Sequence, residues 1–290
     1  MNPKPWWRRL GHGGLLLVAT IYCVFPIYFM LVQSLKTAQE DIFGNPLIVL
    51  NPTFENFEEL FARKGDVRGF VGSALRRSYP VLAWLENTII VFAGSVAVTL
   101  VASILAAYAL GRLQPPGFRW WRRAIFAVYV IPHTILFVPL YQVVLGLHLD
   151  DNILALVLIY PTLALPFCVW ILSAYFQHLP REVEESALVE GASRTTAFFR
   201  IILPMSRPVV IAAGIFALGT IASDFTLASV FLLSEHNQTI PAGLGTMEVA
   251  LDELLAVAGI NLMAIPVVLI CAVFARSYVR GLTAAMVEGA

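Results

Sequence analysis

The sequence predicts an all-α integral membrane protein with six transmembrane helices. Of its 290 residues, 59% are hydrophobic and only 13% are charged, a composition outside the usual range of soluble globular domains. Six stretches supply the roughly 20 mainly apolar residues that a helix needs to cross a bilayer. Lipid offers no hydrogen bonds, and the sequence lacks the alternating segments of about ten residues that mark a membrane barrel, so the spans are expected to be helices.

The first predicted span follows a short basic N-terminus. Its apolar run from Leu15 to Val32 is too long for the core of a cleaved signal peptide, and no small-residue cleavage pattern follows it, so we expect a retained membrane helix. We treat the whole chain, residues 1–290, as a single transmembrane domain. In chain order the predicted spans are residues 12–34, 86–111, 121–146, 152–176, 207–233 and 256–279.

The distribution of basic residues predicts the orientation. Six spans place both termini on one side, and thirteen of the 19 lysines and arginines fall on that side, so both termini are expected to be cytoplasmic. The other six lie in residues 35–85, a segment long enough for charge to matter less. This external segment carries Phe54, Phe57, Leu60 and Phe61 at near-helical spacing, which predicts short amphipathic helices outside the membrane, with a solvated linker as the alternative.

Residues 179–204, between the fourth and fifth spans, are predicted to form a cytoplasmic helix-turn-helix elbow. Pro180 suits a first helical turn, and the acidic residues after it complement the helix dipole. Gly191 fits the end of this helix. Ser193 or Thr195 could cap a second short helix, which ends at Pro204.

The first helix of the elbow has small residues flanked by acids, a surface that can press into a partner's groove. Ser186 and Ala187 allow close approach, and a neighbouring carboxylate can pair with a basic residue of the partner. An exposed pair would contribute only about 0–1 kcal/mol. The alternative interpretation is an ordinary solvated loop helix.

The elbow resembles the signature loop of ABC-importer permeases, E-A-A-x-x-x-G followed by a hydrophobic stretch that ends in L-P. The loop here reads Glu185-Ser186-Ala187-Leu188-Val189-Glu190-Gly191-Ala192 and continues to Leu203-Pro204. Ser186 replaces the first alanine and Glu190 stands where the family usually has aspartate, and both changes preserve size or charge. The similarity covers nearly the whole chain and points to the maltose-type, carbohydrate branch, through residues 52–57, 85–88, 107–112 and 281–289.

This resemblance implies a permease subunit of an ATP-driven importer in the cytoplasmic (inner) membrane of a bacterium or archaeon. A second homologous permease would complete the translocation pathway, two cytoplasmic ATPase subunits would grip the loops, and an extracytoplasmic solute-binding protein would deliver a carbohydrate or related polyol. Glycerol phosphate, maltodextrin, trehalose and other glycosides all stay open. The residues expected to couple this chain to the ATPases are Glu184, Glu185, Ser186, Ala187, Glu190, Gly191, Ala192, Phe198, Leu203 and Pro204.

The sequence predicts neither an enzyme nor a resident cofactor in this chain. It lacks the G-x-x-x-x-G-K-[ST] phosphate-binding pattern, and Gly11-His12-Gly13-Gly14 has neither its spacing nor its lysine. ATP and Mg are therefore expected on the partner ATPase subunits. The histidines do not cluster, which argues against a metal site, and a net charge of +0 with no basic run argues against nucleic acid.

The fifth span carries a carboxylate, Asp224, that costs several kcal/mol in lipid unless it faces a cavity or a partner. Ser223-Asp224-Phe225 resembles an N-[DE]-F element of carbohydrate permeases, although a helix-packing hydrogen bond is an equal alternative. A proton-coupled secondary carrier using Asp224 is the alternative function. The candidate pathway residues are Asp224, Ser223, Thr226, His133, Tyr129 and Tyr160, and the resemblance implies binding-protein contacts at Glu235, His236, Asn237 and Gln238.

Overall fold

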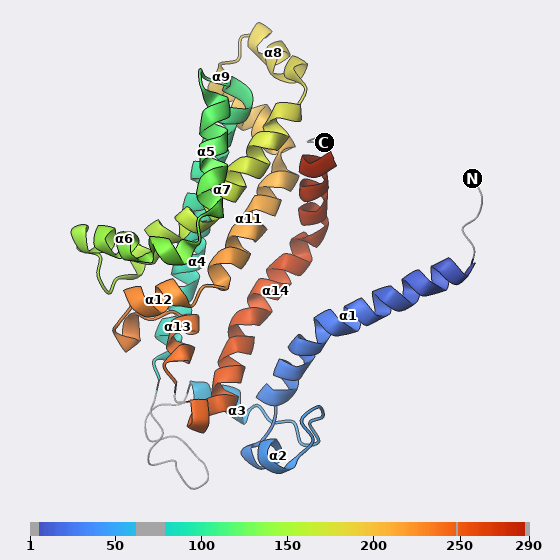
Figure 1. Ribbon diagram of the computed structural model, residues 1–290, viewed down its shortest axis with the longest axis vertical. Helices are drawn as coiled ribbons and strands as arrows, with labels where there is room; N and C mark the ends of the chain where they lie inside the picture. Colours follow the sequence, from blue (N-terminus) through green and yellow to red (C-terminus); the bar gives the residue numbers. More distant parts are fainter. Residues whose placement is uncertain (1–5, 62–78, 248, 288–290) are drawn as a thin grey trace. The chain divides into compact units, whose positions relative to one another are not determined.

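The computed structural model describes residues 6–61, 79–247 and 249–287, and every regular element in these ranges is helical (Figure 1). The all-α prediction is therefore confirmed. The chain separates into two compact units, one formed by Met1–Val81 with Thr246–Ala264 and the other by Leu82–Gly245 with Ile265–Ala290. Residues 62–78 of the predicted external segment lie outside the described residues.

The described residues include four helical stretches long and apolar enough to cross a membrane. Two bent pairs of helices, Phe118–Val130 with Ile135–Gly146 and Arg194–Met205 with Arg207–Ala222, meet the same criterion when each pair is taken together. By length and composition the described residues thus hold four spans, or up to six. The four single stretches are Gly13–Ser34, Val81–Leu113, Ile153–His178 and Glu253–Gly281.

The first unit contains α1 (Trp6–Ser34), α2 (Ala38–Phe43), α3 (Glu55–Leu60) and the first part of α14 (Val249–Val287). The apolar stretch of α1 is almost entirely exposed. The side-chain amide of Asn56, in α3, binds the segment at the end of α1: it donates to the carbonyl oxygens of Ser34 at 2.9 Å and Lys36 at 2.8 Å. Helices α2 and α3 both fall within the predicted external segment.

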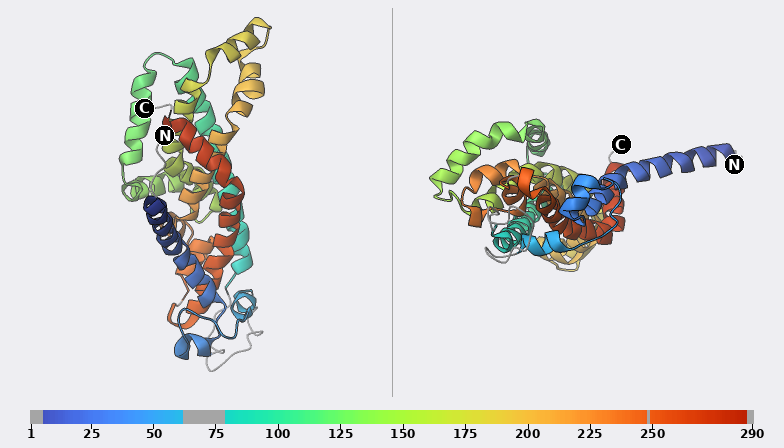
Figure 2. Two further views of the ribbon diagram at one scale, coloured as in Figure 1. Left: turned by 90° about the vertical axis from the view of Figure 1, so that its right-hand side faces the viewer. Right: turned by 90° about the horizontal axis from the view of Figure 1, so that it is seen from below.

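The second unit is built around α7 (Ile153–His178). Helix α7 packs against α11 (Arg207–Ala222), α5 (Phe118–Val130) and η1 (Ala109–Leu113), a π-helical turn that continues α4 (Val81–Tyr108) (Figure 2). Pro161 and Pro166 lie inside α7, which still runs as one helix. Its position between neighbours explains why half of its apolar stretch is buried.

Two predicted spans are not continuous helices. Within residues 121–146, α5 ends at Val130 and α6 (His133–Gly146) begins after Pro132, at an angle of 103°. Pro132 explains the break, because proline disfavours the helical conformation of the preceding residue, and Ile131 is extended. Within residues 207–233, α11 ends at Ala222 and α12 (Thr226–Phe231) follows after a short gap.

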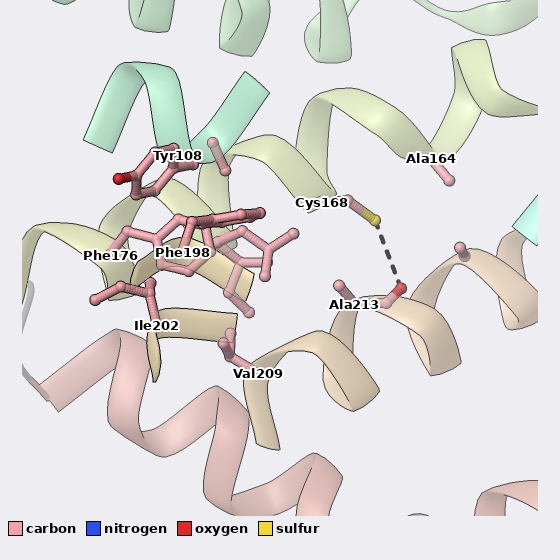
Figure 3. Packing of buried hydrophobic residues seen from close by; sticks show 12 residues of the cluster. Tyr108, Ala164, Cys168, Phe176, Phe198, Ile202, Val209 and Ala213 are labelled. Carbon is pink, nitrogen blue, oxygen red and sulfur yellow. Dashed lines mark hydrogen bonds between the residues drawn. The ribbon is translucent and has the colours of Figure 1, made fainter. Parts of the chain in front are cut away.

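The apolar interior of the second unit forms two clusters. The first joins the ends of α4 and α7 to α11, with Tyr108, Phe176, Phe198 and Val209 among its members (Figure 3). The second lies where α4, α6 and α7 meet α12 and includes Tyr160 and Phe231. Helix α8 (Arg181–Val189) lies at one end of this unit, and α12 and α13 (Ile240–Gly245) lie toward the opposite end (Figure 1).

Candidate functional site

The elbow predicted over residues 179–204 consists of α8 and α9 (Arg194–Ala197), joined by a glycine turn. Pro180 is the residue before α8, and Gly191 has φ +91°, a left-handed conformation that favours glycine. Ser193 caps α9, because its hydroxyl accepts a hydrogen bond of 3.1 Å from the amide of Thr196. Local sequence signals thus account for where both helices start and where α8 ends.

The chain returns to the membrane-spanning part through η2 (Phe198–Ile202), a π-helical turn, and α10 (Leu203–Met205). Phe198 and Ile202 are buried in the first apolar cluster (Figure 3). Pro204 lies inside α10, and α11 then begins at Arg207. The elbow is therefore joined to α7 on one side and to α11 on the other.

Helix α8 has a buried face and an exposed face. Glu184 and Ala187, three residues apart and so on one side of the helix, are buried. Glu185, Ser186 and Glu190 are exposed, and Val189 is 88% exposed. The residues of the predicted coupling loop thus separate into an inward set and an outward set.

The inward carboxylate of Glu184 is fixed by two residues of the α4 end. The Nε atom of Arg112 lies 2.6 Å from Oε2 of Glu184, and the Tyr108 hydroxyl donates to Oε1 at 2.8 Å. Burial raises the pKa of the Glu184 carboxyl, but the hydrogen bonds from Arg112 and Tyr108 and the charges of Arg112 and Arg194 outweigh it, so the pKa is lowered. Glu184 is thus held as a carboxylate.

Asp224 and Tyr160, two of the pathway candidates, are brought together by a hydrogen bond, and Tyr160 belongs to the second apolar cluster. One oxygen of Asp224 accepts from the Tyr160 hydroxyl at 3.0 Å and from the amides of Leu227 at 3.1 Å and Ala228 at 3.3 Å. Asp224 thereby supplies acceptors to the first turn of α12 and is only 8% exposed. This arrangement matches the helix-packing alternative for Asp224.

The other pathway candidates lie on several elements. Ser223 and Thr226 are exposed on either side of Asp224, with the Ser223 hydroxyl donating to the Thr220 carbonyl at 3.0 Å. Tyr129 is in α5, and its ring centroid lies 5.9 Å from that of Phe167. His133 is the first residue of α6.

The segment with the predicted binding-protein contacts is held by the start of α4. The indole of Trp84 donates to the Glu235 carbonyl at 2.6 Å, and the Asn87 amide donates to the carbonyls of His236 at 2.9 Å and Gln238 at 3.0 Å. Gln238 is buried, whereas His236 is exposed. The backbone of residues 235–238 is therefore pinned, and His236 is its most accessible side chain.

A second clamp on this segment, Asp151, was not predicted from the sequence. Its carboxylate accepts from the backbone amides of Leu233 at 2.8 Å and Ser234 at 2.9 Å, and also from the Ser234 hydroxyl. Burial raises the pKa of Asp151, but these hydrogen bonds and one from Asn237 lower it more. Asp150, Asp151 and Asn152 are residue types that favour turns, but nothing in the local sequence indicates a partner more than 80 residues away.

Among the residues that the structure describes, no group of three or more histidine, cysteine, aspartate or glutamate side chains could hold a metal ion.

Comparisons with known proteins agree with this architecture. The family model described as "Binding-protein-dependent transport system inner membrane component" matches residues 99–286. An inner membrane ABC transporter permease protein, YcjP, of Escherichia coli strain K12 is 30% identical over 97% of each chain. The sulfoquinovosyl glycerol transport system permease protein SmoH of Agrobacterium fabrum is 31% identical over 97% of this chain and 93% of its own length.

A solved structure has a similar fold. The crystal structure of a bacterial ABC transporter involved in the import of the acidic polysaccharide alginate contains a chain that superposes with a TM-score of 0.74. The matched regions cover 95% of this chain and 99% of that one, at 17% sequence identity.

Proposed function

The chain belongs to the family of binding-protein-dependent transport system inner membrane components, and from this we propose that it is one permease subunit of an ATP-driven carbohydrate importer. In this proposal it spans the inner membrane several times with both termini in the cytoplasm, and it pairs with a second homologous permease. The solute is a carbohydrate or a related polyol. The sulfoquinovosyl glycerol permease among the relatives, named for a solute that joins a sugar to glycerol, supports this class.

The exposed face of α8 is the observation that carries the proposal. It presents the carboxylate Glu185, the small Ser186 and the apolar Val189, and a second exposed carboxylate, Glu190, follows directly after the helix. A groove on a cytoplasmic ATPase subunit could take up Val189 and pair a basic residue with either carboxylate. ATP and Mg would then bind to the ATPase subunits, and this chain would hydrolyse nothing itself.

The proposed mechanism is alternating access driven by the ATPase dimer. When the dimer closes on ATP, it displaces α8, which is connected to α7 through Leu179 and Pro180 and to α11 through α9, η2 and α10. Because α7 and α11 pack along each other, the two helices would rotate together and open the pathway outward. The pinned segment of residues 233–238 lies toward the opposite end of the unit from α8, where the binding protein would dock (Figure 1).

A pull-down tests the proposal directly. The tagged chain is purified from detergent-solubilised native membranes, and co-purifying chains are identified and assayed for ATP hydrolysis with and without candidate sugars. We expect an ATPase and a second permease to be recovered. Glu185→Lys should lose the ATPase and keep the second permease, whereas the control Glu58→Lys, on an exposed residue of α3, should keep both.

The opposite result would point to the proton-coupled carrier. If the chain is recovered alone and still transports in proteoliposomes under a proton gradient, the importer assignment is wrong. Asp224 would then become the first residue to substitute.

A further inference from the structure

A buried ion pair joins α8 to the π-helical turn at the end of α4. The side chains of Arg112 and Glu184 are only 5% and 8% exposed, and their charged atoms are 2.6 Å apart. The remaining nitrogens of Arg112 donate to the carbonyls of Leu179 at 2.7 Å and Pro180 at 3.0 Å. One guanidinium thus binds both the first turn of α8 and the two residues that lead into it.

The π-helical turn η1 sets the position of Arg112. This turn packs against α7 so closely that a Cβ atom on Gly111 would lie 2.6 Å from the Ser173 carbonyl oxygen. Arg112 follows Gly111 directly and is buried, and the turn ends at Leu113, before Gln114, which has φ +48°. The turn thus places the Arg112 guanidinium against Glu184, with which it forms an ion pair.

Tyr108 extends the contact to α7 and η2. While its hydroxyl donates to Glu184, its ring lies 4.4 Å from the Phe198 ring and 6.1 Å edge-on from the Phe176 ring. Figure 3 shows Tyr108 beside Phe176 and Phe198 in the apolar cluster. Helices α4, α7, α8 and η2 therefore meet at one buried group of three polar side chains.

We propose that Arg112, Glu184 and Tyr108 form a latch that makes α4 move with α8, a role that rests on the proposed function. Without the latch, α8 would be joined to the unit by its two chain connections, which contain Pro180 and Gly191, and by the packing of its apolar residues. Such a helix could tilt when an ATPase subunit pulls on it, and the displacement would be absorbed at the elbow. Separating Arg112 from Glu184 would leave a buried charge without its partner, which is energetically costly. While the ion pair stays intact, a displacement of α8 is therefore transmitted to α4 as well as to α7 and α11.

In this proposal two adjacent carboxylates have different roles. Glu185 faces outward and would contact the ATPase, whereas Glu184 makes its hydrogen bonds within the chain and acts as a positioning residue. The variants Glu184→Gln and Glu185→Gln remove the same charge one residue apart and are therefore a matched pair. Tyr108→Phe is a milder variant that removes one hydrogen bond and keeps the ion pair and the ring packing.

The test uses the whole importer, co-expressed with its ATPase, second permease and binding protein and reconstituted in proteoliposomes. We expect Glu184→Gln to retain the ATPase subunits while solute uptake per ATP hydrolysed falls about tenfold, a factor that corresponds to about 1.4 kcal/mol. Tyr108→Phe should give a smaller fall in the same ratio. Glu185→Gln should instead weaken recovery of the ATPase.

A distance measurement separates a transmitting role from a merely structural one. Spin labels are placed at Glu182→Cys, on α8 but outside the proposed ATPase contact, and at Leu105→Cys on α4, both exposed positions, after Cys23 and Cys271 are replaced by alanine. In the unaltered latch the distance between the labels should be the same with and without ATP. In Glu184→Gln it should shift or broaden when ATP is added.

The outcomes distinguish the two proposals. If the ATPase is recovered and Glu184→Gln transports with normal coupling and an unchanged label distance, the latch is wrong and the importer stands. A label distance that changes with ATP in the unaltered chain as much as in Glu184→Gln also rejects the latch. Recovery of no ATPase with any variant overturns both proposals.

Discussion

Replacing Gly111 with alanine tests how rigidly η1 is packed against α7. The new Cβ atom would lie 2.6 Å from the Ser173 carbonyl oxygen and 3.2 Å from Cβ of Phe176. The nearer atom belongs to the backbone of α7, so it cannot move away by a change of side-chain rotamer. Overpacking of this kind costs about 1–3 kcal/mol, more than the roughly 0.5–1 kcal/mol that alanine gains over glycine within a helix. We expect a net destabilisation of about 1 kcal/mol.

The assay is the thermal transition of the detergent-purified chain, followed as the fraction that stays monodisperse after heating. Gly219→Ala is the control, because Gly219 lies in α11 and a Cβ atom there meets nothing within 4 Å. The control should match or exceed the original stability, and Gly111→Ala should fall below it. If the two variants were equally stable, the close packing of η1 on α7 would not be rigid, and the placement of Arg112 would need another explanation.

Three further predictions follow from single contacts. Ser193→Ala should cost about 1 kcal/mol and speed amide exchange in α9, measured by mass spectrometry, because the hydroxyl caps that helix. The lowered pKa of Glu184 means that its ion pair stabilises the fold above the unfolded pKa of about 4.3, and this contribution is lost as the pH falls through the folded pKa. The stability gap between the original chain and Glu184→Gln, measured by thermal transitions, should therefore narrow from about pH 6 to pH 3. In Asp151→Asn the new asparagine can keep the positive φ of this position, but its amide group places a donor next to the donors that the carboxylate accepted from. Hydrogen bonds to charged groups contribute roughly 1.5–3 kcal/mol, so amide exchange at Leu233 and Ser234 should rise about tenfold or more.

Neighbouring residues provide the controls for these changes. Thr195→Ala, at the other candidate cap, should leave exchange in α9 unchanged, and an equal effect of both variants would remove Ser193 from the capping role. A stability gap for Glu184→Gln that widens in acid would contradict the sign derived from its pKa. Asp150→Asn, one residue before the clamp and exposed, should leave exchange at Leu233 unchanged, so equal effects at both positions would reject the clamp.

The parts of the elbow that the sequence predicts are those with local causes. A proline before α8, a glycine at its end and a capping serine before α9 each act within a few residues. The pairing of Arg112 with Glu184 joins positions 72 residues apart. From the sequence, Glu184 is one acid among several that suit a helix N-terminus, so only the fold reveals which of them turns inward.

The break between α5 and α6 shows a different limit. Residues 121–146 are mainly apolar, and hydropathy measures preference for lipid without specifying the direction of the helix. Pro132 signals a weak point, but prolines 161 and 166 lie inside α7 without ending it. The difference lies in the surroundings, because α7 is packed by neighbours on several sides, whereas much of the α5–α6 corner is exposed.

Asp224 connects a break in a helix with a buried charge. A carboxylate inside an apolar segment needs donors, and the first turn of a helix that starts within an apolar cluster has backbone amides that need acceptors. Asp224 meets both needs at once, because it lies between α11 and α12 and accepts from the amides of Leu227 and Ala228. The hydroxyl of Tyr160 completes its shell. A proton carrier working through Asp224 would have to release these donors in every cycle and so loosen the start of α12, whereas a permease that moves its helices as bodies can keep them in place.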